Sequence, residues 1–191
     1  EEGRAVYDNL HKFLTYILSS NIPEIVPYLA FALFAIPLPL TVMQILAVDL
    51  GTDLLPALAL GAERPDPAVM RRPPRPRQAH LIDAGLLARA YLWLGMMEAA
   101  VALAAYFFVL TQSGWRYGTM PAATDAGYRM ATTACLSAIV VMQGINVFLC
   151  RSPTRSAFAA EVGGNRLLPV ALTVEIGLLA AIVYTLPGQA I

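Results

Sequence analysis

The sequence has few charged side chains. Charged residues make up 14% of its 191 residues and hydrophobic residues make up 58%, whereas soluble domains average about 25% charged and about 45–50% apolar residues. This composition excludes an ordinary soluble domain, and it excludes intrinsic disorder, which needs low hydrophobicity and high charge. The 13 basic and 13 acidic side chains cancel, so the basic excess of a nucleic-acid-binding protein is missing as well. The remaining class is a membrane protein. Its expected partner is the lipid bilayer, and no nucleic acid is expected to bind.

Cysteine is scarce, and no secretory signal is present. Cys135 and Cys150 lie in one apolar run. In a helix they would be roughly 22 Å apart at about 1.5 Å per residue, which is too far for a disulfide. Residues 1–4 contain no initiator Met and begin no signal-peptide pattern. We therefore expect a piece of a longer protein or a natural truncation of one.

Five apolar segments are long enough to cross a bilayer. Each has about 20–25 residues, and a helix of that length spans the hydrocarbon core of about 30 Å. We predict an all-α polytopic membrane bundle of about five transmembrane helices. A tight turn at Pro37-Leu38-Pro39 is expected between the first two. The predicted segments are 13–36, 39–60, 86–110, 128–150 and 167–186, with hydrophilic connections at 61–85, 111–127 and 151–166.

The basic residues are distributed unevenly between the two sides of the membrane. If five helices alternate in direction, eleven basic residues fall on one side and only Arg116 and Arg129 on the other. The positive-inside rule makes the richer side cytoplasmic. This predicts a cytoplasmic N-terminus, an outward C-terminus and residence in a plasma or inner membrane. The eleven residues are Arg4, Lys12, Arg64, Arg71, Arg72, Arg75, Arg77, Arg89, Arg151, Arg155 and Arg166.

Five acidic residues interrupt the apolar segments, and no Lys or Arg lies at a comparable depth. A charge at the bilayer centre costs at least ~2.5–3.5 kcal/mol, so these acids need a proton or a bound cation. Hydrogen bonding between helices is the alternative. It stays open for Glu98, which has no polar neighbour three or four residues away, and for Glu175, which has only Thr173 nearby. The five acids are Glu24, Asp49, Asp53, Glu98 and Glu175.

Two groups of polar residues share helix faces. Asn21 and Glu24 are three residues apart, and Asp49, Thr52 and Asp53 are three and four residues apart. Two helices joined by a tight turn can direct both faces at one point. The resulting all-oxygen ligand set suits a hard cation, namely Na⁺, K⁺, Ca²⁺ or H⁺.

Prolines and a glycine add backbone ligands to the same two helices. Pro23, Pro27 and Pro56 lack an N–H, so each leaves the carbonyl four residues earlier without its helical hydrogen bond. Gly51 loosens the turn before Pro56. Free carbonyls at membrane depth are tolerated where they line a cavity or coordinate an ion.

These stretches resemble the fifth and sixth membrane helices of the type II P-type cation-transporting ATPases. The resemblance is close over residues 1–77 and looser over 78–186, where the chain is similar to the family's seventh to ninth helices. The stretches that carry it are Ser20-Asn21-Ile22-Pro23-Glu24-Ile25, Ile36-Pro37-Leu38-Pro39-Leu40 and Asp49-Leu50-Gly51-Thr52-Asp53, with the flanks Glu2-Gly3-Arg4 and Met70-Arg71-Arg72-Pro73-Pro74-Arg75.

The resemblance implies that the chain is the ion-translocating membrane part of an ATP-driven cation pump. Asn21, Glu24, Asp49, Thr52 and Asp53 match the positions that coordinate the transported ion in that family. The pattern looks more like the sodium/potassium and proton/potassium pumps than the reticulum calcium pumps, which carry Asn at the position of Asp49. Bacterial calcium or sodium pumps share the general pattern, so the ion stays open.

The resemblance also implies an additional cation site. Tyr16, Gln143 and Glu175 match its positions in the sodium pump, and Ser20 is a further candidate. Asn146 stands where that family has Asp, a departure that weakens this interpretation. Gln143 and Asn146 share one helix face, and hydrogen bonding between helices is again the alternative.

Parts that such a pump needs are missing from the sequence. It contains no Asp-Lys-Thr-Gly phosphorylation motif, so ATP and Mg²⁺ would bind only to other domains of a parent pump. This chain alone should then be inactive. The expected partners are those domains, the family's first four membrane helices and a small accessory subunit. A stand-alone membrane channel, accessory protein or scaffold derived from a pump is the alternative.

The resulting domain prediction has five parts. The loop after the second helix either contacts the phosphorylation domain, as the resemblance implies, or serves as a positively charged anchor. The parts are a cytoplasmic stalk end (1–12), an ion-binding helix pair (13–60), a cytoplasmic basic Pro-rich loop (61–85), three further transmembrane helices with their loops (86–186) and a C-terminal tail (187–191).

Overall fold

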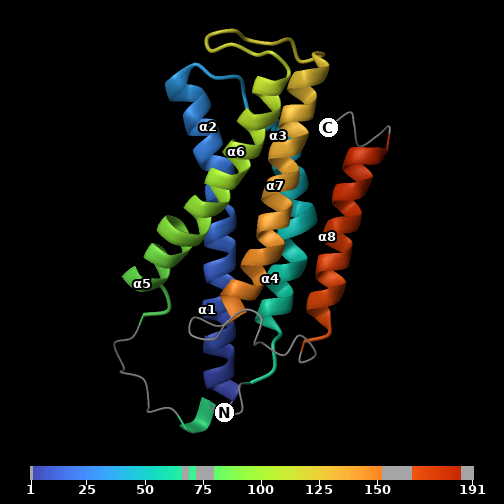
Figure 1. Ribbon diagram of the computed structural model, residues 1–191. Helices are drawn as coiled ribbons and strands as arrows, with labels where there is room; N and C mark the ends of the chain where they lie inside the picture. Colours follow the sequence, from blue (N-terminus) through green and yellow to red (C-terminus); the bar gives the residue numbers. More distant parts are fainter. Residues whose placement is uncertain (1, 66–68, 72–79, 152–164, 186–191) are drawn as a thin grey trace.

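Five helical spans form one elongated bundle (Figure 1). The computed structural model describes residues 2–65, 69–71, 80–151 and 165–185, and these ranges contain no strand. An all-α membrane bundle of five spans is therefore confirmed. The helices long and apolar enough to cross a membrane cover Glu2–Phe34, Val42–Gly61, Ala84–Gln112, Ala126–Arg151 and Leu167–Tyr184.

The first span is interrupted at Asn21. Helix α1 (Glu2–Ser20) ends there and α2 (Ile22–Phe34) begins. Pro23 lies in the first turn of α2 and cannot donate to the carbonyl of Ser19, so the α1 hydrogen-bonding pattern stops. The Asn21 backbone keeps helical angles (φ −70°, ψ −24°), and α2 therefore continues in the general direction of α1.

The second span changes its winding in the middle. Helix α3 (Val42–Ala47) leads into a π-helical turn, η1 (Val48–Asp53), and then into α4 (Leu54–Gly61). Pro56 cannot donate to the carbonyl of Thr52, which removes one α-helical bond at this point. The wide π turn is rare in helices and frequently marks a functional site. It contains every polar residue that the sequence singled out in this span.

The connection between these spans is longer than predicted. A three-residue turn at Pro37-Leu38-Pro39 was expected, but α2 ends at Phe34 and α3 begins at Val42. Ala35 takes left-handed angles (φ 50°), and the two prolines disfavour helix in the residues before them. The predicted bounds 13–36 and 39–60 were therefore too long at this end.

The other three spans agree with the prediction to within two residues at each end. The third combines α5 (Ala84–Leu87), a second π-helical stretch, η3 (Ala88–Gly95), and α6 (Met96–Gln112). The fourth is α7 (Ala126–Arg151) and the fifth is α8 (Leu167–Tyr184). A 3₁₀ turn, η2 (Val69–Arg71), lies between the second and third spans.

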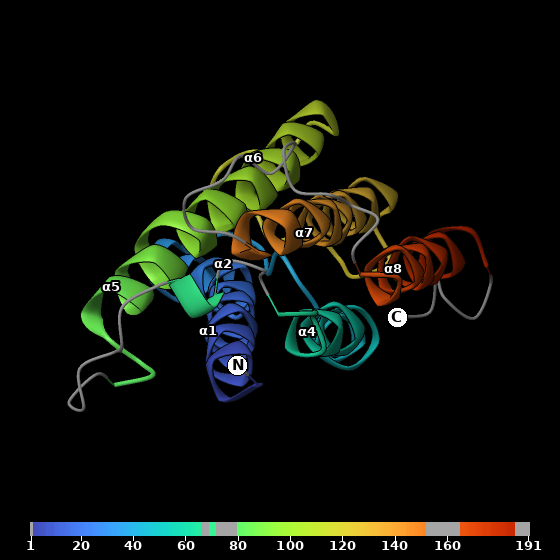
Figure 2. The ribbon, with the colours of Figure 1, turned by 90° about the horizontal axis from the view of Figure 1, so that it is seen from below.

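Helix α7 lies at the centre of the bundle. Seen from below, it is flanked by α6 on one side, by α1 and α4 on another, and by α8 (Figure 2). The contact between α6 and α7 is the most extensive of all. Cys135 and Cys150 are buried on α7 as free thiols, as their predicted separation requires. Polar side chains that face α7 from four spans can therefore meet.

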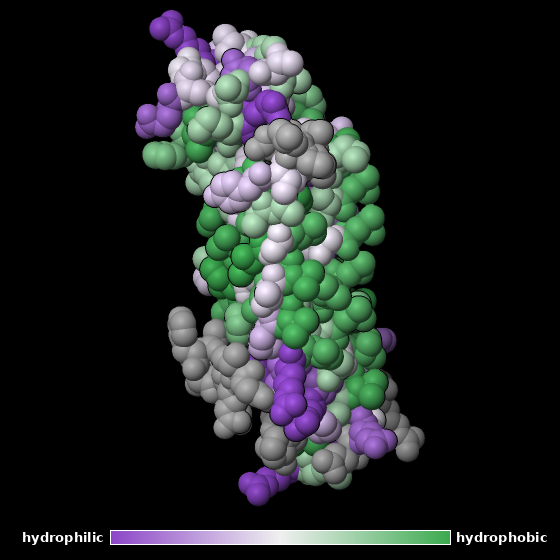
Figure 3. Space-filling view, turned by 90° about the vertical axis from the view of Figure 1, so that its right-hand side faces the viewer, coloured by the Kyte–Doolittle hydropathy of each residue, from purple (hydrophilic) through white to green (hydrophobic). Residues whose placement is uncertain are grey.

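The surface of the bundle is apolar in the middle. On the face shown in Figure 3, hydrophobic residues cover the central part, and hydrophilic residues gather towards the two ends. Leu33, Leu50, Leu92 and Phe108 are 72%, 68%, 73% and 66% exposed. An exposed apolar surface this extensive is unfavourable in water and matches the hydrocarbon core of a bilayer.

Some predicted features lie outside the described residues. These are the C-terminal tail 187–191, the basic residues Arg72, Arg75, Arg77 and Arg155, and parts of the Pro-rich loop, namely 66–68 and 72–79.

Candidate cation-binding site

The break in the first span carries three of the predicted site residues. Ser20 is buried, and Glu24 is 8% exposed with its Oε1 lacking a hydrogen-bond partner within the described ranges. Asn21 is half-buried at the break itself. Asp49 is an electrostatic neighbour of Glu24. The structure thus brings together the two carboxyl groups that the spacing directs at one point.

The π turn of the second span presents the other predicted ligands. Thr52 and Asp53 are 2% and 4% exposed, and Asp49 is half-buried. Ser20 and Asp49 act on Asp53 as electrostatic neighbours. The Thr52 hydroxyl lies 2.9 Å from the Val48 carbonyl oxygen and 3.2 Å from Gln143 Oε1. The π turn therefore contacts both the first span and α7.

The residues of the predicted additional site also lie in the interior. Tyr16, Gln143, Asn146 and Glu175 are each no more than 2% exposed. The Tyr16 hydroxyl has Asp53 and Glu175 as electrostatic neighbours. These residues come from α1, α7 and α8, and Asp53 of the π turn lies beside them.

Buried polar atoms without a partner are concentrated in this region. Leaving such an atom unsatisfied costs about 1–3 kcal/mol, and more when the group is charged. A bound cation would satisfy the oxygens among them, and most are carboxylate or phenol oxygens that suit a hard cation. In the described part of the chain the atoms are Tyr16 OH, Glu24 Oε1, Asp53 Oδ1, Glu98 Oε1, Gln143 Nε2 and both carboxylate oxygens of Glu175.

Carboxylates alone do not complete a metal site. Among the described residues, no three His, Cys, Asp or Glu side chains are grouped closely enough to hold a metal ion. A cation bound here would need hydroxyl, amide or carbonyl oxygens in addition to one or two carboxylates. Thr52, Asn21 and the carbonyls released by Pro23 and Pro56 are of these types.

Glu98 and Asn146 form a pair that the sequence alone did not reveal. Glu98 is 0% exposed, and its Oε2 accepts a hydrogen bond of 2.6 Å from Asn146 Nδ2. Its own helix offers no polar neighbour, and its partner lies on α7, 48 residues away. The only signal in the sequence was the presence of an acid and an amide in two apolar segments.

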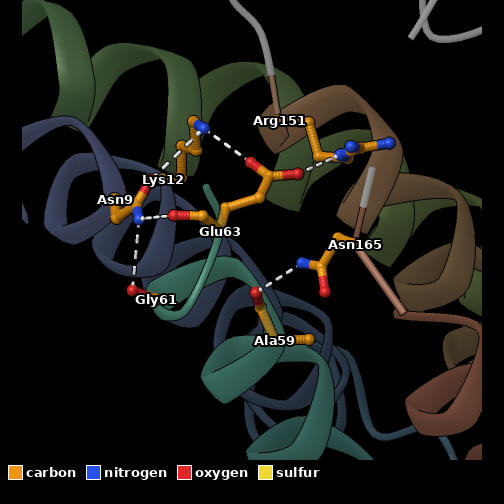
Figure 4. A network of polar contacts seen from close by, with 7 residues as sticks. All are labelled: Asn9, Lys12, Ala59, Gly61, Glu63, Arg151 and Asn165. Carbon is orange, nitrogen blue, oxygen red and sulfur yellow. Dashed lines mark hydrogen bonds and ion pairs between the residues drawn. The ribbon is translucent and has the colours of Figure 1, made fainter. Parts of the chain in front are cut away.

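A second network of polar contacts connects the ends of several spans at one end of the bundle (Figure 4). Glu63, just beyond α4, pairs with Lys12 of α1 at 2.5 Å and with Arg151 at the end of α7. The Glu63 side chain is 8% exposed. One carboxylate therefore joins the ends of the first, second and fourth spans.

Two asparagines extend this network through backbone carbonyls. Asn9 Nδ2 donates to the Gly61 and Glu63 carbonyl oxygens at 3.3 and 2.6 Å. Asn165 Nδ2 donates to the Ala59 carbonyl oxygen at 2.7 Å. The bonds to the Ala59 and Gly61 carbonyls satisfy oxygens in the last turn of α4, which have no partner within that helix. Nothing in the local sequence of Asn9, Glu63 or Asn165 distinguishes these residues, so they were not predicted.

Comparisons with known proteins agree with this architecture. The family described as "Cation transporting ATPase, C-terminus" matches residues 37–191. The sodium/potassium-transporting ATPase subunit alpha of Drosophila melanogaster is 37% identical over 183 residues, which cover 83% of this chain and 18% of that protein.

Two other relatives carry similar names. The corresponding subunit alpha of Hydra vulgaris is 47% identical over 116 residues, covering 60% of this chain and 11% of the relative. The subunit alpha-4 of Rattus norvegicus is 34% identical over 214 aligned positions, covering 99% of this chain and 21% of the relative. The chain thus spans no more than about a fifth of the length of these proteins.

Proposed function

The chain belongs to the family of cation-transporting ATPase C-terminal regions, and from this premise we propose that it is the membrane ion-translocating part of an ATP-driven pump for a hard cation. The observation that carries the proposal is the set of buried carboxylates without basic partners between facing spans. Glu24 lies beside Asp49, and Asp53 lies beside both the first span and α8. Charges at this depth need a positive partner, and the cargo would provide it.

The ligand roles in this proposal follow the geometry. Asn21 and Glu24 of the first span, with Asp49, Thr52 and Asp53 of the π turn, bind the transported cation directly. The additional position next to them is lined by Tyr16, Ser20, Gln143, Asn146 and Glu175. Na⁺, K⁺, Ca²⁺ and H⁺ all suit oxygen ligands, so the choice among them is left to measurement.

Transport in this scheme depends on movement of the first span. Helix α1 runs without interruption from Glu2 to the break at Asn21. A displacement of its N-terminal end at Glu2 therefore reaches Glu24. Asp49 and Asp53 lie on a separate span, so the distance between the two ligand groups changes. That change alters cation affinity and opens the site to alternate sides of the membrane.

The driving force comes from elsewhere in this proposal. ATP and Mg²⁺ bind to other domains of the pump, and further partners are the preceding membrane helices and a small accessory subunit. The end of the bundle that carries Arg4, Lys12 and Arg151 faces the cytoplasm, as the positive-inside rule requires, in a plasma or inner membrane.

ATP hydrolysis by the pump that carries this chain tests the proposal. It should be measured across Na⁺, K⁺, Ca²⁺ and pH. Glu24→Gln and Asp49→Asn each remove one carboxylate and should weaken stimulation by the transported cation by about 30-fold or more, because truncating one member of a buried charge pair costs about 2–5 kcal/mol.

Asp125→Asn is the matched control. Asp125 lies outside the spans and accepts a hydrogen bond from the Tyr128 backbone, a role that Asn can keep. This variant should retain the cation dependence of the wild type. If both Glu24→Gln and Asp49→Asn also retained it, the assignment of the site would be wrong.

A further inference from the structure

Glu98 is a buried acid with only one of its two oxygens bonded. It lies on α6 and is 0% exposed. Oε2 accepts the hydrogen bond of 2.6 Å from Asn146, whereas Oε1 has no partner within the described ranges. The charged groups that act on Glu98 are Asp53, Glu24 and Glu175. All three are acidic, so its surroundings disfavour a negative charge unless a positive ion is present.

A purely structural role explains the Asn146 bond but not the carboxylate. Glutamine has the same length and would accept that hydrogen bond through its carbonyl oxygen. It would avoid the cost of a charge at membrane depth, which is at least ~2.5–3.5 kcal/mol. It would also avoid repulsion from three neighbouring acids. The carboxylate is favourable only where a proton or a bound cation offsets both costs.

We propose that Glu98 is an anionic ligand of a second cation position, bounded by α6, α7, α8 and α1 and distinct from the position between Glu24 and Asp49. Tyr16, Gln143 and Glu175 supply the surrounding oxygens. The Tyr16 hydroxyl and both Glu175 carboxylate oxygens are buried without a partner within the described ranges, and Gln143 Oε1 accepts a hydrogen bond from the Thr52 hydroxyl. Asp53 neighbours both positions. The occupant is a hard cation, because the ligands are all oxygens.

The pair also accounts for an anomaly in the sequence. Asn146 stands where the resembling pumps carry Asp, which weakened the prediction of an additional site. The structure places a carboxylate across the α6–α7 interface from Asn146, at a hydrogen-bond distance. The negative charge is therefore retained in the same place but is supplied by a different helix. This inference rests on the proposed function and adds Glu98 to it.

Direct cation binding tests the proposal. The complete polypeptide that carries residues 1–191, in lipid nanodiscs, is titrated by equilibrium dialysis with radioactive Na⁺, K⁺ and Ca²⁺ in separate experiments at several pH values. Proton uptake is followed in parallel with a pH indicator. We expect two positions in the wild type. Glu98→Gln should weaken one of them by about 100-fold and leave the other unchanged. Asp49→Asn should do the reverse.

A charge exchange provides the decisive control. The double variant Glu98→Gln/Asn146→Asp returns the carboxylate to α7 and keeps a hydrogen bond between the two side chains. It should restore binding to within about tenfold of the wild type, which a merely structural hydrogen bond would not predict. If circular dichroism shows that Glu98→Gln does not fold, Glu98→Asp is used instead. It keeps the carboxylate but shortens the side chain by one methylene. That variant should weaken only the second position.

The outcomes separate the two proposals. Failure of the wild type to bind any of these cations or to take up protons overturns the proposed function. If the wild type binds and Asp49→Asn loses one position, but Glu98→Gln binds like the wild type, the role of Glu98 is overturned and the proposed function stands. Loss of the second position for any of these cations supports the assignment, and the cation affected identifies the occupant.

Discussion

Lys12 on α1 and Glu63 just beyond α4 form an ion pair of 2.5 Å that ties together the two spans carrying the candidate cation ligands (Figure 4). The same carboxylate pairs with Arg151 at the end of α7. The side chains of all three residues are at most 20% exposed, so solvent screens these pairs less than it would on an open surface. Glu63 therefore connects the N-terminal half of α1 with the ends of α4 and α7.

Glu63→Gln should destabilise the bundle. The substitution leaves Lys12 and Arg151 facing an uncharged amide, and removing one partner of a buried pair costs about 3–5 kcal/mol. We expect a lower midpoint of thermal unfolding in detergent. Lys12→Gln leaves the Arg151 pair in place and should cause a smaller decrease. Equal midpoints for the wild type and Glu63→Gln would show that the network adds no stability.

Gly95→Ala should be destabilising as well. A Cβ atom at this position would lie 2.6 Å from Ile22 Cβ and 2.9 Å from the Ser19 carbonyl oxygen, which is closer than non-bonded atoms tolerate. Neither contact is with the flexible end of a side chain, so a helix must shift, at a cost of about 1–3 kcal/mol. Thermal unfolding measures the effect.

Gly177→Ala is the control for this experiment. A Cβ at Gly177 meets nothing within 4 Å. Alanine favours a helix over glycine by about 1 kcal/mol, so this variant should be neutral or stabilised. A stabilised Gly95→Ala would contradict the close approach of the third span to the break in the first.

Two tyrosines hold the connection between the first two spans. The Tyr106 hydroxyl donates to the Pro37 carbonyl oxygen at 3.0 Å, and the Tyr128 hydroxyl donates to the Leu38 carbonyl oxygen at 2.8 Å. Tyr106→Phe removes one bond and leaves a buried carbonyl without it, which should cost about 1–3 kcal/mol in thermal unfolding. Tyr184→Phe, at a position that is 83% exposed, should change little.

Thr52→Val tests the contribution of the π turn. The hydroxyl lies 3.2 Å from Gln143 Oε1, and under the proposed function it also binds the cation. Its loss should weaken cation binding by about tenfold, corresponding to one hydrogen bond of about 1.4 kcal/mol, as measured by equilibrium dialysis.

Thr111→Val is the matched control for Thr52→Val. The Thr111 hydroxyl bonds only to carbonyls of its own helix, Phe107 and Phe108, and it is exposed. Binding should therefore be unchanged in this variant. Unchanged binding in Thr52→Val too would exclude its hydroxyl from the ligand set.

The sequence by itself determined the five spans and the carbonyls that proline leaves without a helical hydrogen bond. Transfer of apolar side chains to a bilayer is nearly additive along a helix, so about 20 apolar residues predict a span without knowledge of its neighbours. Proline also acts locally, because its missing N–H removes one helical hydrogen bond. Pro23 and Pro56 thus indicated which carbonyls lose a bond, and the break at Asn21 and the π turn lie at these places, although α2 continues through Pro27.

Only the tertiary structure decided which buried polar groups meet. Glu98 had no partner on its own helix, and Asn146 departed from the expected pattern, yet their side chains are 2.6 Å apart. Glu63 likewise gained Lys12 and Arg151 from other spans. Such pairs depend on the rotation and depth of each helix. The packing of all five spans sets the rotation and depth of each helix. The hydropathy along one segment does not predict either of them.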